Sequence, residues 1–478
     1  MKTRREFIKD TAASIAVVAL EGTTRAFAAA KSRPDANAIR QFKNAFGGRV
    51  IVPTDAEYDF ARKAGGTDKH PTIVAQCGNE QDVLRCIDFA RQYELEVAVR
   101  SGNHSFLGWG TCNEGIVVDL SRMKGIVVDP VKRTVVVSTG STAEQILAAT
   151  SAHGLAPVLG QCGGVGSGLV LGGGLGWLSG RHGATCDNLV SAHIVTAEGR
   201  SLTADSVTNP DLFWAIRGGG GNFGIATSLE YQLYPLKEVL AGSLVYPINR
   251  AASILRLFRE LMSTAPDDLQ ADCYLTTRNA AAKLNVVYSG RLDKGEQLLN
   301  TFRSANTPDQ DSMKRTSFSE IYQMFGADEP ASCPLALDKG TYVEKLSDEV
   351  IDLVVGRLRQ SPPSCETVFN FSHYMHGQVC RVSPDATAFE LRNADAVHLV
   401  FWVQWKDAVN TSACTSWHND TFDRLQRYSG GRIYSNFMST EEGGPKAIYA
   451  SNYSHLLQVK RKYDAHNFFH LNQNIQPK

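Results

Sequence analysis

The sequence lacks several features that mark common functional classes. It has no excess of charge, since 49 lysines and arginines balance 49 aspartates and glutamates, whereas a protein that binds nucleic acid needs a basic face. Its ten cysteines are dispersed without a CxxC pair, which argues against a structural zinc site. We therefore expect no nucleic-acid partner and no bound metal.

The sequence also has little that could cross a membrane. The apolar stretch at residues 12–20 is about half the ~20 residues that a spanning helix needs. It follows Arg4 and Arg5 and precedes a small-x-small sequence at residues 26–28, which is the pattern of a twin-arginine signal peptide. Residues 1–30 are therefore expected to direct export by the twin-arginine machinery, to the periplasm or the exterior of a bacterium, without a membrane anchor.

The length suffices for a large core. The 478 residues, 43% of them hydrophobic, suggest two domains or one large one. Periodicity and capping predict helices and strands in the first half, with the last two strands pairing in a second small sheet. These are strands at residues 72–75 and 96–99, helices at 80–93 and 143–153, and strands at 115–121 and 133–138.

After Pro235 the pattern changes to longer strands. The expected strands are at residues 241–246, 282–288 and 396–405, and the expected helices at 252–262, 318–325 and 348–358. The sequence thus predicts an α+β protein whose second part is an antiparallel sheet covered by helices on one side.

Glycine is concentrated in residues 160–176, which hold nine glycines. At this density a backbone can approach a large flat ligand, or adopt positive φ, without a Cβ in the way. Cys162 lies in this stretch and would project at whatever the glycines hold. By itself, the stretch is also compatible with a glycine-rich hairpin that carries an incidental cysteine.

Two other segments of the chain resemble ligand-binding loops. Residues 99–105 read Val-Arg-Ser-Gly-Asn-His-Ser and contain His104. Residues 218–224 form a separate glycine loop, which lacks the early βαβ setting and the following acidic residue of a Rossmann dinucleotide site.

Together the three stretches resemble the berberine-bridge-enzyme-like FAD-linked oxidases, a branch of the vanillyl-alcohol-oxidase flavoproteins with the PCMH-type FAD-binding fold. The resemblance is closest at residues 97–227 and after residue 449. It implies a bicovalent FAD, bonded at the 8α-methyl carbon by His104 and at flavin C6 by Cys162. It also implies a two-part FAD-binding domain at residues 31–238, a substrate-binding domain at 239–430 and a C-terminal segment at 431–478 that returns to the FAD domain.

The resemblance also implies the other cofactor-binding residues, in loops whose backbone N–H groups would cradle the pyrophosphate. One of them departs from the family, because Asn103 replaces a glycine. Asparagine tolerates positive φ, so the loop shape is expected to survive. The expected residues are Arg100, Ser101, Gly102, Asn103, Ser105, Gly160, Val165, Gly166, Gly168, Gly172, Gly173, Gly176, Asn222, Gly224, Ile225, Asn436 and Gln473.

The family's usual catalytic base is absent. Many members use the tyrosine that closes a Tyr-x-Asn-Tyr motif, and here the motif reads Tyr434-Ser435-Asn436-Phe437. Phenylalanine has no proton to exchange. Tyr434 is expected to pack and to form hydrogen bonds rather than to act as the base.

A replacement is expected on the strand at residues 396–405. Alternation puts His398, Val400, Trp402 and Gln404 on one face. His398, with a pKa that is ordinarily near 6.5, is the candidate base, and Trp402 and Gln404 would contact substrate. Tyr374 and His376 form an alternative catalytic pair.

The resemblance suggests the reaction. Valine three residues after the flavin-bound cysteine, here Val165, tends to accompany access of O2 in the family. We therefore expect an oxidase that takes a hydride from a CH–OH or similarly activated carbon of a sugar, alcohol or secondary metabolite and produces H2O2. Two alternatives remain: a dehydrogenase that passes electrons to a periplasmic carrier, and a flavin-carrying binding protein without turnover, which Phe437 would suit.

Overall fold

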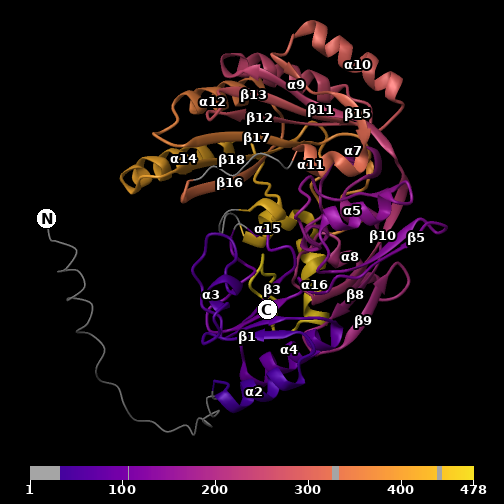
Figure 1. The fold of residues 1–478 in the computed structure, drawn as a ribbon, viewed down its shortest axis with the longest axis vertical. Coiled ribbons are helices and arrows are strands. Elements are labelled where there is room, and N and C mark those ends of the chain that lie inside the picture. Colours follow the sequence, from indigo (N-terminus) through magenta and orange to yellow (C-terminus); the bar gives the residue numbers. More distant parts are fainter. Residues whose placement is uncertain (1–32, 106, 326–332, 439–443) are drawn as a thin grey trace, which may run out of the picture.

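Three β-sheets and the helices between them organise the chain (Figure 1). The structure, a computed structural model, describes residues 33–105, 107–325, 333–438 and 444–478. The signal-peptide pattern at residues 1–30 lies outside the described residues. In Figure 1 the eight-stranded sheet and its helices lie at the top, and the two smaller sheets lie below.

The first sheet has four strands in the order β1-β2-β4-β3. The strands β2, β4 and β3 are parallel, and β1 is antiparallel to β2. The helix α4 connects β2 to β3 and is capped by Asn79, whose side chain accepts a hydrogen bond from the N–H of Asp82. The elements are α2 (Ala36–Ala45), β1 (Arg49–Ile51), α3 (Tyr58–Ala61), β2 (Ile73–Gln76), α4 (Glu80–Tyr93), β3 (Val97–Arg100) and β4 (Ile116–Asp119).

The position of β4 corrects the prediction that it would pair with the strand at residues 133–138. All four residues of β4 are buried, because it lies between β2 and β3 in the first sheet. Strands of this kind are hydrophobic along their whole length, so alternation could not assign its partner. The second sheet has the order β5-β6-β10-β8-β9, with β7 beside β10. Its strands are β5 (Ile126–Asp129), β6 (Thr134–Ser138), β7 (Leu155–Pro157), β8 (Leu189–Val195), β9 (Ser201–Asp205) and β10 (Ile225–Pro235).

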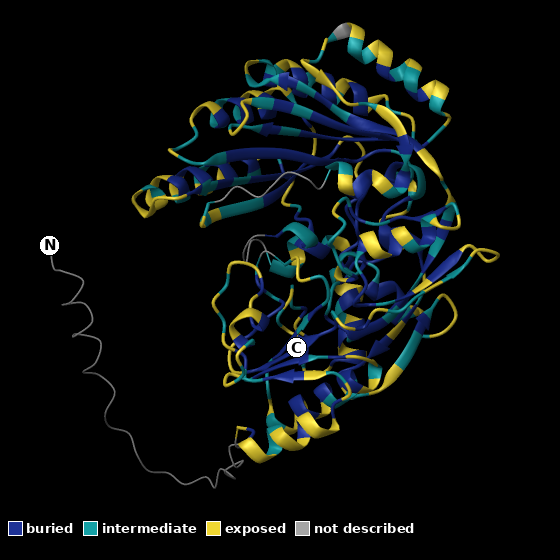
Figure 2. Cartoon of the chain, in the orientation of Figure 1, coloured by how far each residue is buried: buried dark blue, intermediate teal, exposed yellow. Residues whose placement is uncertain are grey.

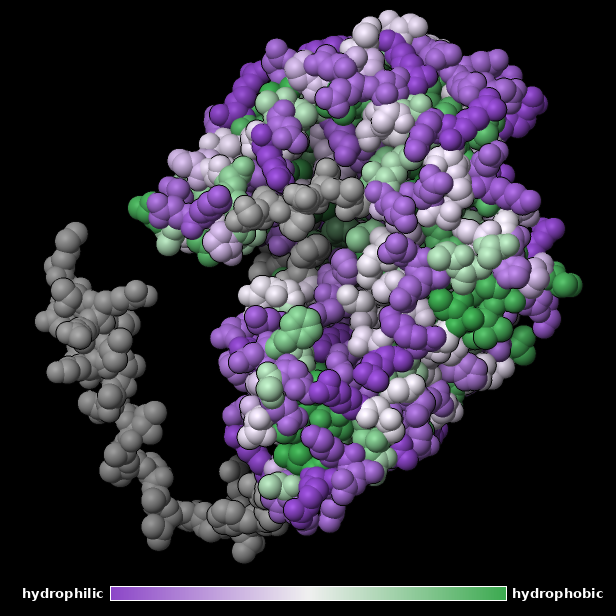
Figure 3. Space-filling model, in the orientation of Figure 1, coloured by the Kyte–Doolittle hydropathy of each residue, from purple (hydrophilic) through white to green (hydrophobic). Residues whose placement is uncertain are grey.

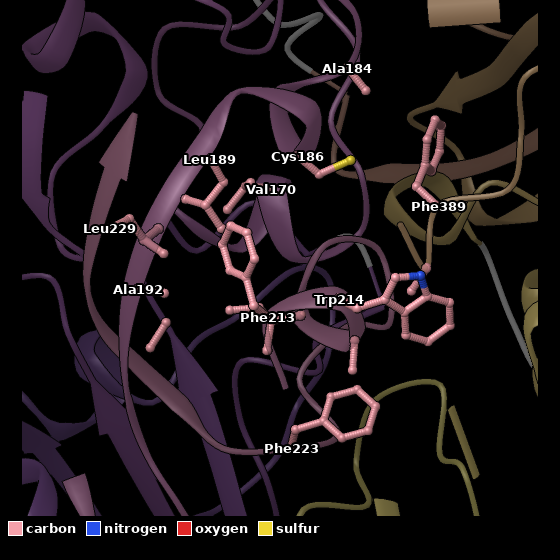
Figure 4. Close-up of a cluster of buried hydrophobic side chains, with 14 of the residues drawn as sticks. Val170, Ala184, Cys186, Leu189, Ala192, Phe213, Trp214, Phe223, Leu229 and Phe389 are labelled. Carbon is pink, nitrogen blue, oxygen red and sulfur yellow. The ribbon is translucent and has the colours of Figure 1, made fainter. Parts of the chain in front are cut away.

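A large core lies between the second sheet and the segments that connect its strands. Figure 4 shows part of it, in which Phe213, Leu229 and Cys186 are among the buried side chains. Cys186 is fully buried and is a packing residue, as predicted. The connecting helices are α5 (Ala143–Ser151), α6 (Gly168–Leu171), α7 (Ser179–His182), η1 (Thr185–Asn188) and α8 (Pro210–Ile216).

The third sheet has eight antiparallel strands in the order β14-β11-β13-β12-β17-β18-β16, with β15 also beside β11. The helices α9 (Ala251–Ser263), α12 (Asp348–Arg359) and α14 (Thr411–Gln426) pack against one face of it, as the sequence predicts. Figure 2 shows the strands mostly buried and the helices exposed along their outer sides. The strands are β11 (Glu238–Pro247), β12 (Leu269–Thr276), β13 (Ala281–Tyr288), β14 (Gln310–Asp311), β15 (Lys314–Ser317), β16 (Leu335–Val343), β17 (Glu366–Tyr374) and β18 (Val397–Trp405).

Helices and short 3₁₀ turns join these strands. They are η2 (Ile248–Arg250), α9 (Ala251–Ser263), α10 (Leu292–Ala305), η3 (Phe318–Glu320), α11 (Ile321–Phe325), α12 (Asp348–Arg359), α13 (Gln378–Arg381), η4 (Ala408–Asn410) and α14 (Thr411–Gln426). A disulfide links Cys333 and Cys365, which precede β16 and β17. In the described part of the chain, no helix has the length and apolar character that crossing a membrane demands.

The last segment of the chain packs back on the core of the second sheet. Ile448 and Leu456 belong to that core. Lys460 and Asp464 form a fully buried ion pair, and the Lys460 ammonium also donates to the backbone carbonyls of Asn222 and Phe469. The elements are η5 (Ser435–Phe437), α15 (Gly444–Tyr449), η6 (Ala450–Asn452) and α16 (Tyr453–Tyr463).

The surface in Figure 3 is mostly hydrophilic, with hydrophobic patches over the region of β5 and β10 and over the region of β1. Val127 and Val136, which are opposite each other on β5 and β6, are exposed.

Candidate functional site

The loops that carry His104 and Cys162 are in direct contact. A Cβ on Gly102 would lie 2.4 Å from the backbone nitrogen of Gly166, and a Cβ on Gly164 would lie 2.6 Å from Nε2 of His104. Real Cβ atoms do not come so close, so only glycine allows this packing. Ser101 strengthens the contact, because its hydroxyl oxygen accepts a hydrogen bond from the N–H of Ser167 at 3.2 Å.

The two proposed attachment residues are accessible. Cys162 is a free, exposed thiol, and His104 is exposed as well. The loops nevertheless withdraw enough water from the imidazole to lower the pKa of His104. The imidazole is therefore mostly neutral at pH 7, which leaves one ring nitrogen with a free electron pair.

The backbone at Asn103 has φ of +57°. This confirms that asparagine keeps the conformation that a glycine would adopt there. Its side-chain amide donates to the carbonyl of Lys63 at 3.1 Å, which fixes the loop from the outside.

Arg100 and Ser105 support the same loop from inside the protein. The guanidinium of Arg100 is buried against the carboxylate of Asp119 at 2.7 Å and donates to the carbonyl of Ala61. The hydroxyl of Ser105 accepts from the N–H of Trp109 at 3.3 Å. Since these contacts occupy the Arg100 guanidinium, we expect Arg100 to hold the loop rather than to bind a cofactor directly.

The rest of the glycine-rich stretch lies against three other segments. The carbonyl of Gly160 accepts from the hydroxyl of Tyr322 at 2.9 Å, and the carbonyl of Val165 accepts from the first N–H of α5 at 2.9 Å. Val165 and Gly166 line a cavity of about 10 Å³. A Cβ on Gly176 would lie 1.7 Å from the carbonyl of Leu159, whereas one on Gly168 would meet nothing within 4 Å.

Gly172 and Gly173 lie against the turn at η5 and against Phe389. A Cβ on Gly172 would lie 2.1 Å from Oδ1 of Asn436, and a Cβ on Gly173, where φ is +105°, would meet the Phe389 ring at 2.3 Å. Asn436 donates to the carbonyl of Leu169 at 2.9 Å. The glycines thus let η5 approach the cofactor loops.

The C-terminal segment completes this framework. Asn222 donates to the carbonyl of Gln473 at 3.1 Å and accepts from the N–H of Ile475 at 3.0 Å, while the Gln473 amide donates to the carbonyl of Ser435 at 2.8 Å. Gly224, with φ of +152°, lies against β8, and Ile225 is buried in the core of the first sheet. Asn222 and Ile225 therefore brace the loops from within.

Buried polar atoms without partners indicate that this framework is built for a ligand. In the described part of the chain, Nε2 of Gln161 and Oγ of Ser167 have no hydrogen-bond partner. Unpartnered buried groups are costly, and both lie in the glycine-rich stretch, where the backbone is bare. A large flat cofactor with a pyrophosphate, such as FAD, fits these residues.

The polar face of the eight-stranded sheet lies opposite its helices. Val397, Leu399, Phe401, Val403 and Trp405 pack into the helix-side core. Alternation therefore turns His398, Trp402 and Gln404 to the other face, as predicted. Trp402 and Gln404 are partly exposed there, and His398 is only 1% exposed.

The contacts of Ser372 bear on which ring nitrogen of His398 carries the proton. The hydroxyl of Ser372 lies 2.8 Å from Nδ1 of His398 and 3.3 Å from its backbone carbonyl. If the hydroxyl donates to the carbonyl, its oxygen accepts from Nδ1–H, and the free electron pair of the imidazole is at Nε2. Among the described residues, that Nε2 has no partner.

Burial and the nearby His373 hold the pKa of His398 well below its usual range. The pKa of His373 is itself lowered by burial to about 3. The His398 ring is 4.6 Å from the Phe437 ring and 5.2 Å from the Tyr434 ring, centre to centre. A neutral imidazole thus lies beside the position where the family has its tyrosine.

Tyr434 packs and forms hydrogen bonds, as expected. Its hydroxyl oxygen accepts from Asn436 at 3.0 Å and from the backbone N–H groups of Gly174 and Leu175. Burial raises the pKa of Tyr434. The phenol therefore stays protonated and fixes η5 to the glycine-rich stretch.

The alternative pair, Tyr374 and His376, is not brought to His398. A bulge in β17 between Phe371 and His373 shifts the alternation, so Tyr374 lies in the helix-side core and donates to Asp395 at 2.9 Å. His376 lies against α7, where a Cβ on Gly180 would be 2.7 Å from its ring. Local sequence could not reveal the bulge that separates them.

Sequence reasoning missed three residues of the polar face, namely Asp338, Asn370 and Tyr274. Asp338 on β16 is directly opposite Trp402, and Asn370 on β17 is opposite Tyr274 on β12. Burial raises the pKa of Asp338. Alternation within β16 and within β17 could have indicated which of their residues share a face. It could not indicate that both strands pair with β18, because that pairing joins residues that are distant in the chain.

A larger cavity of about 570 Å³ lies elsewhere. Arg278, Cys365 and Lys406 line it, at the far end of β18 from His398. The eight residue steps from His398 to Lys406 correspond to about 26 Å of strand, so this cavity is remote from His398.

A glycine-lined cradle for a large flat cofactor, close to a sheet face with a neutral buried histidine, defines a flavoprotein oxidoreductase. Comparison with protein families agrees. Residues 71–205 match the family model described as FAD binding domain, and residues 433–476 match the model described as berberine and berberine like.

Sequence comparison with known proteins identifies the family of oxidoreductases. The chain is 30% identical to the FAD-linked oxidoreductase pgmH of Aspergillus terreus over 89% of this chain and 93% of that one. It is 27% identical to (R)-6-hydroxynicotine oxidase of Paenarthrobacter nicotinovorans, over 90% and 97%. The chain belongs to the berberine-bridge-enzyme-like family of FAD-linked oxidoreductases and is an FAD-dependent enzyme.

Solved structures share the fold. The crystal structure of 6-hydroxy-D-nicotine oxidase from Arthrobacter nicotinovorans has a TM-score of 0.82 at 26% identity, over 91% of this chain and 99% of that one. Xylooligosaccharide oxidase from Myceliophthora thermophila has a TM-score of 0.81 at 19% identity, over 92% and 99%. The fold is thus the PCMH-type FAD-binding fold joined to an antiparallel sheet.

Proposed function

We propose that this protein is an exported FAD-dependent oxidase that acts on a CH–OH or similarly activated carbon of a small molecule and produces H2O2. His104 and Cys162 would hold FAD covalently. The contact between their loops, the exposure of both side chains and the neutral state of the imidazole support this double attachment.

The single observation that carries the catalytic part is the buried, unpartnered Nε2 of His398 beside Phe437. FAD held by these loops would supply a hydride acceptor whose two electrons, with two protons, would reduce O2 to H2O2. Nε2 of His398 accepts the proton of the substrate hydroxyl as the hydride leaves the carbon.

Ser372 is a positioning residue in this proposal. Its hydroxyl keeps the proton of the imidazole on Nδ1, so that Nε2 is the basic atom. Burial keeps the ring neutral before the reaction, because a charged imidazolium is poorly solvated there.

Val165 supports O2 as the acceptor, because a valine at this position tends to accompany access of O2 to the flavin in the family. The disulfide between Cys333 and Cys365 supports export, since disulfides persist in oxidising compartments. Twin-arginine export of a folded protein suits a cofactor that is attached before export.

The test uses purified full-length protein and a screen of sugars, alcohols and phenolic compounds for peroxide release. We expect at least one compound to reduce the bound flavin under nitrogen and to release peroxide in air. His398→Gln should slow that reduction by about 10²–10⁴-fold, while the exposed control His70→Gln should not change it.

Other results would contradict parts of the proposal. Flavin reduction without peroxide, with rapid transfer to an added dye, would identify a dehydrogenase. A flavin that no compound reduces would identify a binding protein. Activity confined to the cytoplasmic fraction of the native host would exclude export.

A further inference from the structure

We propose that Asp338, Asn370, Trp402 and Gln404 form a recognition subsite that binds the part of the substrate remote from the reacting carbon. The subsite would select for N–H or O–H donors on that part. This inference rests on the proposed function, because it assumes that His398 lies where the reacting carbon binds, at one end of the same sheet face.

The register of the strands sets the length of this subsite. Along β18 the face carries His398, Val400, Trp402 and Gln404 in turn. Asn370 is opposite Val400, and Asp338 is opposite Trp402. At about 3.3 Å per residue these levels lie about 7, 13 and 20 Å from His398, so a substrate that uses them is longer than one ring.

Two carbonyl oxygens on this face have no partner. Asn370 is 8% exposed, and its Oδ1 makes no hydrogen bond within the described part of the chain. The same is true of Oε1 of Gln404. A buried acceptor without a donor is costly, and a substrate that supplies donors would remove that cost.

Asp338 adds a third acceptor at the same level as Trp402. The carboxyl group is partly buried, and that burial raises its pKa. The Trp402 ring is 6.5 Å from the Tyr274 ring at an interplanar angle of 74°. A partly exposed indole beside acceptors can pack against a flat or aliphatic part of a ligand while the acceptors bind its polar edge.

Hydroxyl groups and protonated amines share this donor chemistry, and Asp338 distinguishes them. A neutral hydroxyl needs only an acceptor, which an asparagine at this position would still provide. A protonated amine needs the negative charge as well, because a charge-assisted hydrogen bond is about twice as strong as a neutral one.

The test measures binding by calorimetry with the flavin-loaded protein and two probes of two-ring length, cellobiose and 4-phenylpiperidine. We expect one probe to bind at millimolar concentration or below. Asp338→Ala should weaken its binding about 10-fold. Asp338→Asn should cost less than about 3-fold for cellobiose but as much as Asp338→Ala for 4-phenylpiperidine.

Asp423→Ala is the matched control, because Asp423 is exposed on α14 at the other side of the sheet. Equal affinity of the wild type and Asp338→Ala, or binding of neither probe, would overturn the subsite. The conservative Asp338→Asn guards against a folding defect.

Binding and turnover separate this inference from the proposed function. His398→Gln should leave probe binding within about 2-fold while it slows flavin reduction by any substrate found by about 10²–10⁴-fold. If no compound ever reduces the flavin but Asp338→Ala weakens binding, the subsite stands and the oxidase proposal fails. If His398→Gln slows reduction as expected and Asp338→Ala changes no affinity, the oxidase proposal stands and the subsite fails.

Discussion

Gly164 and His104 approach so closely that a Cβ on Gly164 would lie 2.6 Å from Nε2 of His104. The backbone two residues after Cys162 therefore helps to define where the imidazole can lie. The two proposed attachment points lie on loops that pack together, so a change in the backbone near Cys162 should shift the His104 ring.

Covalent attachment is the first prediction. Acid-precipitated wild-type protein should stay yellow, and its mass should exceed that of the polypeptide by one FAD. His104→Ala or Cys162→Ala alone should keep one bond and the colour, while the double variant should release the flavin into the supernatant. His70→Ala combined with Cys380→Ala is the matched control. A colourless wild-type pellet would contradict the attachment.

Gly164→Ala tests the contact itself. The added methyl group must displace the His104 ring, so attachment at His104 should fall while attachment at Cys162 persists. Gly168→Ala is the control, because a Cβ there meets nothing within 4 Å. Digestion and mass measurement of the flavin-bearing peptides would distinguish the two bonds.

The rate of flavin reduction should depend on pH in a specific way. A neutral His398 is the active form, and its pKa lies well below 6.5, so the rate should stay level from pH 8 to below pH 6.5 and fall only in more acid solution. Stopped-flow reduction with an identified substrate measures this profile. A fall centred near pH 6.5 would be inconsistent with a buried base.

Ser372→Ala should lower the reduction rate about 10-fold, because Nδ1 loses its partner and the electron pair is no longer confined to Nε2. It should also change the acid limb of the pH profile, which a purely structural role would not do. Ser372→Thr keeps the hydroxyl and should restore much of the rate.

Stability should fall as pH decreases below 6.5. Burial lowers the pKa of His373 to about 3 and that of His418 to about 4, whereas both titrate near 6.5 in the unfolded chain. The unfolded state therefore binds more protons below pH 6.5. Each histidine should cost about 1.4 kcal/mol of unfolding free energy per pH unit until its folded pKa is reached.

Urea unfolding between pH 7.5 and pH 4.5 measures this slope. His418→Leu should reduce it by the contribution of one proton. The exposed control His70→Ala should leave it unchanged, and an unchanged slope in His418→Leu would refute the assignment.

The disulfide should stabilise the fold. Cys333 and Cys365 close a loop with a sequence separation of 32, for which the loss of chain entropy predicts about 3–4 kcal/mol. Cys333→Ser should lower the unfolding free energy by about that amount, and Cys380→Ser should not. Equal denaturation midpoints with and without reductant would contradict the linkage.

The sequence predicts much of the fold because its signals are local. Asn79 caps α4, and the helix spans the predicted residues 80–93. The positive φ at Asn103 follows from the tolerance of asparagine for that conformation. Alternation correctly turns His398 and Trp402 to one face of β18.

The remaining features depend on partners that are distant in the chain. The sheet that β4 joins, the bulge that turns Tyr374 into the helix-side core, and the alignment of Asp338 with Trp402 arise from strand pairing. The pairing of Cys333 with Cys365 likewise cannot be deduced from ten dispersed cysteines.

The bonds from Gln473 and Ile475 to Ser435 and Asn222 have a consequence for biogenesis. Before residue 475 has been synthesised, the glycine loops lack these hydrogen bonds, which fix their positions. We therefore expect flavin capture to follow the synthesis of this tail, and deletions that reach it should yield apoprotein even though His104 and Cys162 are intact.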